Sequence, residues 1–441
     1  MKVSVLNHKI IVKEYKIMSV SDLTIKSNYK YYLLALLWPF GALLACLKNW
    51  RTPWAMNVFW IFCAFAGFIH IYTPEGGEFG EGSDIERYVI RLENLHNGII
   101  SFEDVIDNHE KPDYYQLGIT YFVSRFTDDG HVLFLVFGAI FGFFYSRNMW
   151  FILRKLPSRL PQLTWVLIGL FFLVCPIWNV SGVRMWTALQ VFVYGALPSF
   201  FNKYNYRLIW CLITPFIHFS FIFPLIIFGL FWALPNFLKS GNKLAFLSLI
   251  ILLMSFFINV LDIQSIGNLL ETYFPALYED NMAGYLGDEY VDKINEFADQ
   301  KSILFKIVTS WSSLVLCFMS FFCVSWLSSF NDKKAKKIRC LLIFGMLFYA
   351  FANIISIVPS GGRFLSVAQM FLIPAIILSY VYFNNNQYLS AVKFLLFISI
   401  LNIIFDIRIG CEAYGYNLLI GNFLWGIPME NNISLIRYLK S

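Results

Sequence analysis

The chain has 441 residues, of which 58% are hydrophobic and 14% are charged, with a formal net charge of +6. A soluble globular protein carries about 25% charged residues, so this composition excludes an ordinary soluble domain and an intrinsically disordered chain. Aromatic residues make up 19% of the sequence, which is typical of a protein whose surface faces lipid and the membrane interfaces.

The first segment, residues 1–30, carries six lysines but lacks an apolar core followed by a small-residue cleavage site. We therefore expect a basic tail there rather than a removable signal peptide. Residues 31–441 are expected to form a single all-α transmembrane domain. Seven of the eight cysteines lie in or beside apolar stretches, which excludes a disulfide framework.

Charge-free windows of about 20 apolar residues predict membrane-spanning helices. Leu208–Leu238 would be about 46 Å long as one helix, too long for one crossing, and contains three prolines. We expect it to cross twice as a broken pair, giving about eleven or twelve spans in total. The other predicted spans are Tyr31–Leu47, Trp54–Tyr72, Val132–Ser146, Gln162–Val183, Met185–Asn202, Leu244–Leu261, Ile307–Asn331, Cys340–Gly362 and two within Phe364–Phe405.

Charge predicts the orientation of these spans, because basic turns stay on the cytoplasmic side. The segments 73–113 and 262–302 hold 11 and 9 acidic residues against 3 and 2 basic ones, so the loops 73–130 and 262–302 are expected outside. The basic turns expected inside contain Lys48/Arg51, Arg147/Arg154/Lys155/Arg159, Lys203/Arg207, Lys239/Lys243 and Lys333–Arg339.

This orientation places the basic tail outside, against the same rule. Two alternatives remain. Either translation starts at Met18, or Tyr31–Leu47 does not cross the membrane completely.

A short helix is expected just beyond the second span, opened by a capping box of Ser83 and Glu86. Its apolar stripe predicts a helix lying on the membrane surface. Asp84, Arg87 and Arg91 share a neighbouring face, so this helix is either a simple interfacial element with ion pairing or one wall of a site.

Two arginines, Arg184 and Arg363, interrupt long apolar runs at the expected outer membrane edge. Each is either a snorkelling anchor, for which lysine would serve as well, or a phosphate ligand. The second interpretation gains support because each follows small residues that let a ligand approach, and guanidinium binds phosphate oxygens bidentately.

His218 lies near the predicted apex of the broken pair. A titratable group within an apolar span is costly and usually functional, and histidine is a natural general base. The alternative is a structural histidine bonded to a backbone carbonyl. The stretch 111–126 is too short and too polar to span, and its Tyr114 and Tyr115 suit either the interface or stacking on sugars.

The six histidines never cluster at metal-ligand spacing, so we expect no metal and no cofactor. The composition gives no sign of a nucleic-acid partner.

These motifs together resemble the EpsG/Wzy-type family of bacterial polysaccharide polymerases over residues 54–383. The matching positions are Asp84-x-x-Arg87-Tyr88, Arg184-x-x-x-Ala188-Leu189, His218-x-Ser220 and Arg363 opening a late span. The basic tail and the acidic loop 262–302 have no counterpart in the resemblance.

The resemblance implies a GT-C-like glycosyltransferase with extracytoplasmic amphipathic helices in the bacterial inner membrane. It would transfer a growing glycan from undecaprenyl pyrophosphate to a second lipid-linked repeat unit, in O-antigen, capsule or exopolysaccharide synthesis. The family implies a flippase and a chain-length regulator as partners. In this interpretation His218 or Asp84 is the catalytic base, Arg184, Arg363 and Arg87 bind pyrophosphate, and Tyr88, Tyr114 and Tyr115 bind sugar.

Two other function classes remain. A transporter or flippase of lipid-linked oligosaccharide would also use broken helices and polar groups in the membrane, but the chain shows one broken pair and no internal repeat. A membrane-bound acyltransferase using His218 would usually bring a second catalytic group, and none lies near it in the sequence.

Overall fold

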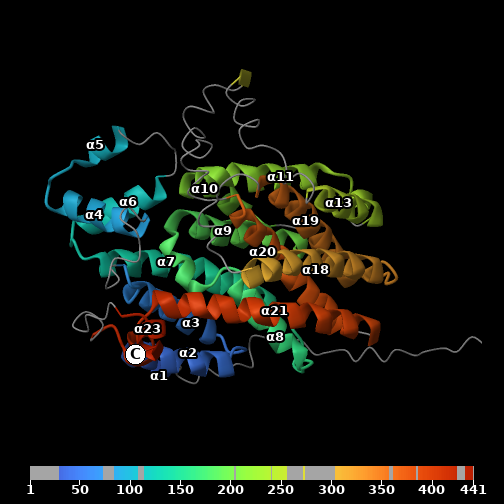
Figure 1. The fold of residues 1–441 in the computed structure, drawn as a ribbon, viewed down its shortest axis with the longest axis horizontal. Coiled ribbons are helices and arrows are strands. Elements are labelled where there is room, and N and C mark those ends of the chain that lie inside the picture. The colour runs from blue at the N-terminus through green and yellow to red at the C-terminus, as the bar shows by residue number, and fades with distance from the viewer. Residues whose placement is uncertain are drawn as a thin grey trace, which may run out of the picture.

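The computed structural model describes residues 29–72, 84–107, 114–202, 205–239, 241–255, 272–273, 303–356, 361–383, 386–424 and 433–440. Within these ranges the chain forms helices and no strand. Most helices run roughly parallel to the long axis of the molecule (Figure 1). The predicted basic tail, the acidic loop 262–302 and Ser83 of the predicted capping box lie outside the described residues.

The first predicted span is two short helices, α1 (Tyr29–Leu37) and α2 (Pro39–Lys48), rather than one crossing. Trp38 between them is extended, with φ −150° and ψ 80°, and Pro39 opens α2, because proline cannot continue a helix from the preceding turn. The Tyr31 ring stacks on Trp54, with ring centroids 3.7 Å apart. The prediction of one span over Tyr31–Leu47 is therefore wrong, and the alternative that this segment does not cross completely is correct.

The pair α3 (Ala55–Phe68) and α7 (Gly130–Leu153) forms the most extensive helix–helix contact among the described elements. A Cβ added to Gly67 would meet the Phe134 carbonyl oxygen at 2.2 Å, and one on Gly138 would meet the Cys63 carbonyl oxygen at 2.7 Å. Small residues at such a crossing let two backbones touch, which is the usual way that helices associate in a membrane.

Three short helices, α4 (Asp84–His96), α5 (Phe102–Asp107) and α6 (Tyr115–Ser124), lie beyond one end of the bundle (Figure 1). The predicted stripe of α4 is buried as expected, which confirms the amphipathic helix. That stripe consists of Ile85, Tyr88, Val89, Leu92 and Leu95. At about 15 Å, α6 is too short to span a bilayer, as predicted.

The predicted break of Leu208–Leu238 into two helices is confirmed, while its two membrane crossings stay a prediction. After α8 (Leu163–Leu173), η2 (Ile177–Ser181), α9 (Val183–Ala196) and η3 (Leu197–Phe200), the chain passes η4 (Tyr206–Leu208) and forms α10 (Ile209–Ile217). His218 is extended, with φ −150° and ψ 114°, and η5 (Phe219–Phe221) then leads into α11 (Ile222–Ala233).

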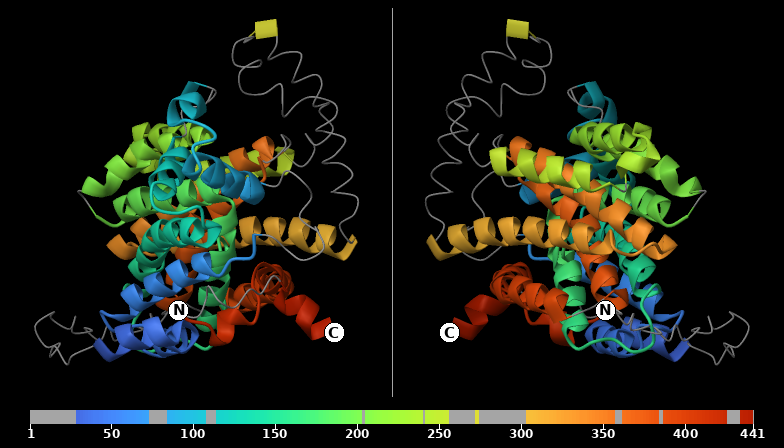
Figure 2. Two further views of the ribbon diagram at one scale, coloured as in Figure 1. Left: turned by 90° about the vertical axis from the view of Figure 1, so that its left-hand side faces the viewer. Right: turned by 90° about the vertical axis from the view of Figure 1, so that its right-hand side faces the viewer.

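The second half continues with α12 (Asn236–Lys239), α13 (Asn242–Ser255), α18 (Ile303–Leu327), α19 (Lys333–Ile355), α20 (Arg363–Tyr382) and α21 (Asn386–Ala413). Two short helices, α22 (Asn417–Ile420) and α23 (Leu435–Lys440), follow. Figure 2 shows α18 and α21, which are in contact, along one flank of the bundle.

Basic turns that are distant in the sequence gather at one end of the bundle, which we call the lysine end. Arg51 donates to the carbonyl oxygen of Pro157 at 2.5 Å, the Tyr382 hydroxyl donates to the Lys155 carbonyl, and the Lys337 ammonium donates to the Phe201 carbonyl. The opposite end carries α4, α6 and the starts of α7, α9 and α20, and we call it the α4 end. The predicted separation of basic turns from the α4 segment is thus confirmed.

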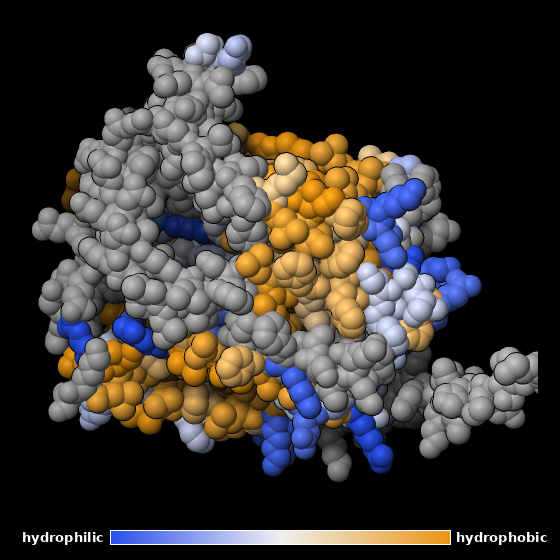
Figure 3. All heavy atoms as spheres, turned by 45° about the vertical axis from the view of Figure 1, so that its right-hand side comes forward, coloured by the Kyte–Doolittle hydropathy of each residue, from blue (hydrophilic) through white to orange (hydrophobic). Residues whose placement is uncertain are grey.

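The chain is a membrane protein by the apolarity of its helices. Four described helices are long and apolar enough to cross a bilayer: Gly130–Leu153, Leu163–Ser181, Lys333–Ile355 and Arg363–Tyr382. Six shorter ones are apolar as well, so the expectation of eleven or twelve spans stays a prediction. Figure 3 shows a broad apolar surface along the flank, bordered by hydrophilic side chains, as expected where lipid replaces water.

Candidate active site

Helix α4 is held at the α4 end by two polar contacts with α6. Arg91 donates to the Gln116 side chain at 3.1 Å, and Nδ1 of His96 donates to the Ser124 carbonyl at 2.7 Å. The apolar stripe of α4 is buried against the rest of the protein. Together with the two contacts to α6, this burial sets the rotation of α4 about its own axis. That rotation determines which of its charged side chains face the bundle.

The central contact of the site joins Tyr88 of α4 to Arg184, the second residue of α9. The Tyr88 ring is 6% exposed, and its hydroxyl lies within hydrogen-bonding reach of the Arg184 guanidinium. Burial raises the pKa of Tyr88, and the charge and hydrogen bond of Arg184 offset part of that rise. Tyr88 therefore stays a neutral phenol that orients Arg184.

Three guanidinium groups, those of Arg87, Arg91 and Arg184, influence one another here, and we call them the arginine cluster. Burial lowers the pKa of Arg91, and the positive charges of Arg184 and Arg87 lower it further. Asp84 forms an ion pair with Arg87 at the exposed side of α4. Guanidinium groups brought together in this way favour a ligand with several anionic oxygens.

His218 occupies the turn between α10 and α11, as predicted. Its Nδ1 accepts hydrogen bonds from the backbone N–H of Ser220 at 3.3 Å and from the Ser220 hydroxyl at 2.9 Å. A backbone N–H can only donate, so the neutral ring carries its proton on Nε2. In this state His218 presents a hydrogen-bond donor.

Arg363 is exposed at the first residue of α20 and follows Gly361 and Gly362. The next residue, Phe364, packs on Phe221 in the turn after His218, with ring centroids 6.0 Å apart. Arg363 and His218 therefore belong to neighbouring segments of the α4 end.

Aromatic packing between α9 and α20 relates the depth of Arg184 to that of Arg363. Phe192 of α9 packs on Phe371 of α20 with ring centroids 6.2 Å apart. Each of these rings lies eight residues after its arginine, which is about 12 Å along a helix. The two arginines thus lie at the same end of the bundle and at similar depth, while their position at a membrane edge stays a prediction.

The predicted site residues fall into two groups. Asp84, Arg87, Tyr88 and Arg184 come together around α4, while His218 and Arg363 come together around Phe221. Helix α6 connects the groups, because it contacts α4, α9 and α10.

The two tyrosines at the start of α6 face different surroundings. Tyr114 is 47% exposed at the α4 end. Tyr115 turns inward, where its ring packs near Phe137 with centroids 5.9 Å apart and its hydroxyl approaches Thr187. Only Tyr114 of this pair presents its ring to a ligand from solvent.

The sequence placed Arg91 on one face with Asp84 and Arg87, but we did not predict a pyrophosphate-binding role for it. The four-residue spacing from Arg87 predicts the shared face of α4, but the influence of Arg184 on Arg91 depends on how α4 packs against the bundle. Within the described part of the chain, no group of three or more His, Cys, Asp or Glu side chains is arranged to hold a metal ion.

Comparison with known proteins gives one match. A family model described as the EpsG family matches residues 55–417, which includes every site residue named above. No curated protein and no solved structure matches the chain.

Proposed function

The chain belongs to the EpsG family, and from that membership we propose that it is a polysaccharide polymerase of the bacterial inner membrane. In this proposal it transfers a growing glycan from undecaprenyl pyrophosphate onto a lipid-linked oligosaccharide repeat unit, in O-antigen, capsule or exopolysaccharide synthesis. The observation that supports it most is the contact of Arg184, at the start of α9, with Tyr88 of the surface helix α4.

The proposed orientation puts the lysine end in the cytoplasm, because basic turns remain inside. The α4 end then faces the periplasm or exterior, where lipid-linked repeat units are presented. Amphipathic α4 lying over the membrane-spanning helices agrees with a GT-C-like architecture, which we propose as the fold type.

The proposed reaction is a direct displacement. A hydroxyl of the acceptor sugar attacks the anomeric carbon of the donor glycan, and a base on the protein takes the hydroxyl proton. The bond between the anomeric carbon and the pyrophosphate oxygen breaks, and undecaprenyl pyrophosphate leaves with the bonding electrons. One displacement inverts the anomeric centre, and no redox change or cofactor is required.

Charge develops on the pyrophosphate oxygens as the glycosidic bond breaks. The arginine cluster would stabilise that charge with preorganised hydrogen-bond donors, the strongest kind of contribution an enzyme makes. Arg363, at similar depth on α20, is proposed to contact the same pyrophosphate from the other side. Because arginines neutralise the leaving group, we propose that the reaction needs no metal ion.

Two residues remain candidates for the base. His218 accepts from Ser220 through Nδ1, so its neutral ring offers a donor, which suits a contact to substrate oxygen. Asp84 is an exposed carboxylate beside the arginine cluster, and this geometry favours Asp84. Loss of a general base lowers the rate by roughly 10²–10⁴-fold. Asp84→Asn should show this loss, whereas a loss of that size in His218→Gln alone would reverse the assignment.

The sugar-binding roles are proposed for exposed aromatic rings, foremost Tyr114. Tyr88 acts through its hydroxyl on Arg184, and Tyr115 contributes by seating α6. The donor and acceptor lipids are the proposed substrates, with a flippase and a chain-length regulator as partners in the membrane.

Deletion of the gene distinguishes a polymerase from a transporter of lipid-linked oligosaccharide. A polymerase mutant leaves single repeat units on the surface glycan, which a gel resolves as one short band. A flippase mutant leaves no repeat units at all, and that result would contradict the proposal. Complementation with the Asp84→Asn variant separates loss of chemistry from loss of the protein.

A further inference from the structure

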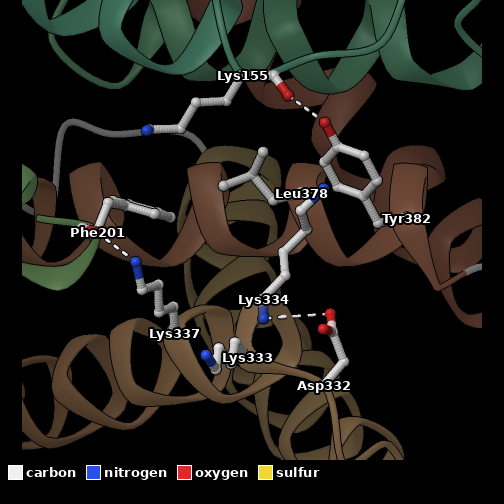
Figure 4. A pocket seen from close by; sticks show the side chains of 8 residues that line it. All are labelled: Lys155, Phe201, Asp332, Lys333, Lys334, Lys337, Leu378 and Tyr382. Carbon is white, nitrogen blue, oxygen red and sulfur yellow. Dashed lines mark hydrogen bonds between the residues drawn. The ribbon is translucent and has the colours of Figure 1, made fainter. Parts of the chain in front are cut away.

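A hollow of about 440 Å³ opens at the lysine end, far from the candidate active site. Figure 4 shows its lining from close by. The ends of α7, η3 and α20 and the start of α19 meet around it. Its lining residues are Lys155, Phe201, Asp332, Lys333, Lys334, Lys337, Leu378 and Tyr382, and we call it the lysine pocket.

Aromatic rings and a carbonyl hold three of the lysines in place. The Lys155 ammonium lies 4.5 Å from the centroid of the Phe201 ring, and that of Lys334 lies 3.6 Å from the Tyr382 ring centroid. Lys337 donates to the Phe201 carbonyl. Such contacts fix the position of an ammonium group but leave its full positive charge in place.

The only acidic residue that lines the pocket, Asp332, forms a helix cap. Asp332 caps α19 by accepting from the backbone N–H of Lys334 at 3.1 Å. Among the residues that the structure describes, no carboxylate forms an ion pair with the four pocket lysines. Burial lowers the pKa of Lys155, and the charges of Lys337 and Lys334 lower it further, so these lysines repel one another.

A basic turn that only sets the orientation of a protein in the membrane needs no particular geometry, because charge near the membrane is sufficient. The lysine pocket, in contrast, has a defined geometry. Its lysines come from two segments distant in sequence and converge on a hollow with an apolar wall of Phe201, Leu378 and Tyr382 (Figure 4). Cationic groups beside an apolar wall match a molecule with a phosphate group next to hydrocarbon.

We propose that the lysine pocket binds the phosphate-bearing headgroup of an anionic phospholipid from the leaflet at the lysine end. The phosphate would contact Lys155, Lys334 and Lys337, and the start of the acyl chains would follow the apolar wall toward the flank. Basic pockets between helices on the cytoplasmic side of membrane proteins bind such headgroups. The bound lipid would join the ends of α7, α19 and α20.

The test measures lipid binding by native mass spectrometry in a nonionic detergent. Wild-type protein is titrated with phosphatidylglycerol, with zwitterionic phosphatidylcholine and with inorganic phosphate. Each basic residue contributes roughly fivefold to the binding of an anionic headgroup. The triple variant Lys155→Gln/Lys334→Gln/Lys337→Gln should therefore bind phosphatidylglycerol on the order of a hundredfold more weakly.

Two controls keep the result specific. Lys48, Arg159 and Lys336 are exposed basic residues of the same end that do not line the pocket, and their triple glutamine variant should bind like wild type. Replacing the three pocket lysines with arginine keeps the charge and should keep the affinity. If the triple pocket variant fails to fold, Lys334→Gln alone should still weaken binding by roughly fivefold.

Equal loss in the pocket and control variants would overturn the proposal, because it would reduce the effect to net charge. Displacement of phosphatidylglycerol by an equal concentration of inorganic phosphate would overturn the lipid assignment. The measurement involves no glycan, so its outcome is independent of the proposed polymerase activity.

Discussion

Tyr88 shows how a single side chain can decide the geometry of a site. Its ring belongs to the buried stripe of α4, while its hydroxyl reaches Arg184 on α9. A long, flexible arginine loses rotamer entropy when it is held in one orientation. Because the Tyr88 contact already restricts Arg184 before substrate binds, less of this entropy is lost on binding. The contact thus couples the packing of α4 to the orientation of Arg184, the proposed phosphate ligand.

Tyr88→Phe tests that coupling, because it keeps the buried ring and removes only the hydroxyl. A hydrogen bond to a charged group contributes about 1.5–3 kcal/mol, so chain elongation should slow by roughly 10- to 100-fold while folded yield stays high. Tyr145→Phe is the matched control, since its hydroxyl donates to the Phe172 carbonyl away from the site. Equal elongation rates in the two variants would show that the Tyr88 hydroxyl does not contribute to the site.

Substitution of Arg184 distinguishes its two possible roles, phosphate ligand and membrane anchor. A lysine snorkels as well as an arginine but lacks the bidentate fork, so Arg184→Lys should lose elongation roughly 10²-fold, nearly as much as Arg184→Ala. Arg363→Ala should likewise abolish long chains. The readout is glycan chain length on a gel in complemented deletion cells. Full-length chains with Arg184→Lys would return this residue to an anchoring role.

Single residues were easiest to predict as site residues where they interrupt an apolar run. Arg184, Arg363 and His218 stand out in this way. Arg91 does not, because it lies within a polar helix face where charged residues are ordinary. Its membership of the arginine cluster depends on the rotation of α4 over α6, which the contacts with Gln116 and Ser124 determine.

At the scale of elements, α1 and α2 are the segment where apolarity misled the prediction. The window Tyr31–Leu47 is apolar enough to span, but Pro39 and the extended Trp38 fold it back on itself. Both the start of α1 and the end of α2 lie near the lysine end, since Tyr31 stacks on Trp54 and Trp150 donates to the Trp50 carbonyl. If this hairpin stays on one side of the membrane, the charge rule and the basic tail agree.

Cysteine labelling tests the hairpin. Tyr29→Cys and Lys48→Cys flank α1 and α2 and should react with an impermeant maleimide only when the cytoplasmic side is accessible. Ile99→Cys is the control at the α4 end, where the native side chain is 69% exposed, and it should react from outside. Labelling of Tyr29→Cys and Lys48→Cys from opposite sides would show that the segment crosses the membrane.

The crossing of α3 and α7 depends on glycine. Gly138→Ala places a methyl group 2.7 Å from the Cys63 carbonyl oxygen, and overpacking of this kind costs about 1–3 kcal/mol. Gly169→Ala is the matched control, because nothing lies within 4 Å of the added methyl group and alanine stabilises a helix relative to glycine by about 1 kcal/mol. Thermal unfolding in detergent should separate the variants, and equal melting temperatures would contradict the close crossing.

At the scale of the whole molecule, the two ends have different chemistry. The lysine end gathers basic turns and the lysine pocket, and the α4 end gathers the arginine cluster, His218 and Arg363. Apolar periodicity and charge could predict this polarity, because lipid and the membrane potential act on composition. They could not predict which turns meet, since that depends on packing such as Phe192 on Phe371.

The central claim is that this chain elongates lipid-linked glycans through the arginine cluster at the α4 end. Its most direct test is elongation by the purified protein in liposomes supplied with undecaprenyl-pyrophosphate-linked repeat units. We predict a ladder of products that persists in EDTA. With Arg184→Lys the ladder shortens to single additions or disappears, and magnesium does not restore it. Absence of any ladder with active lipid-linked substrate, or a full ladder with Arg184→Lys, would contradict the account.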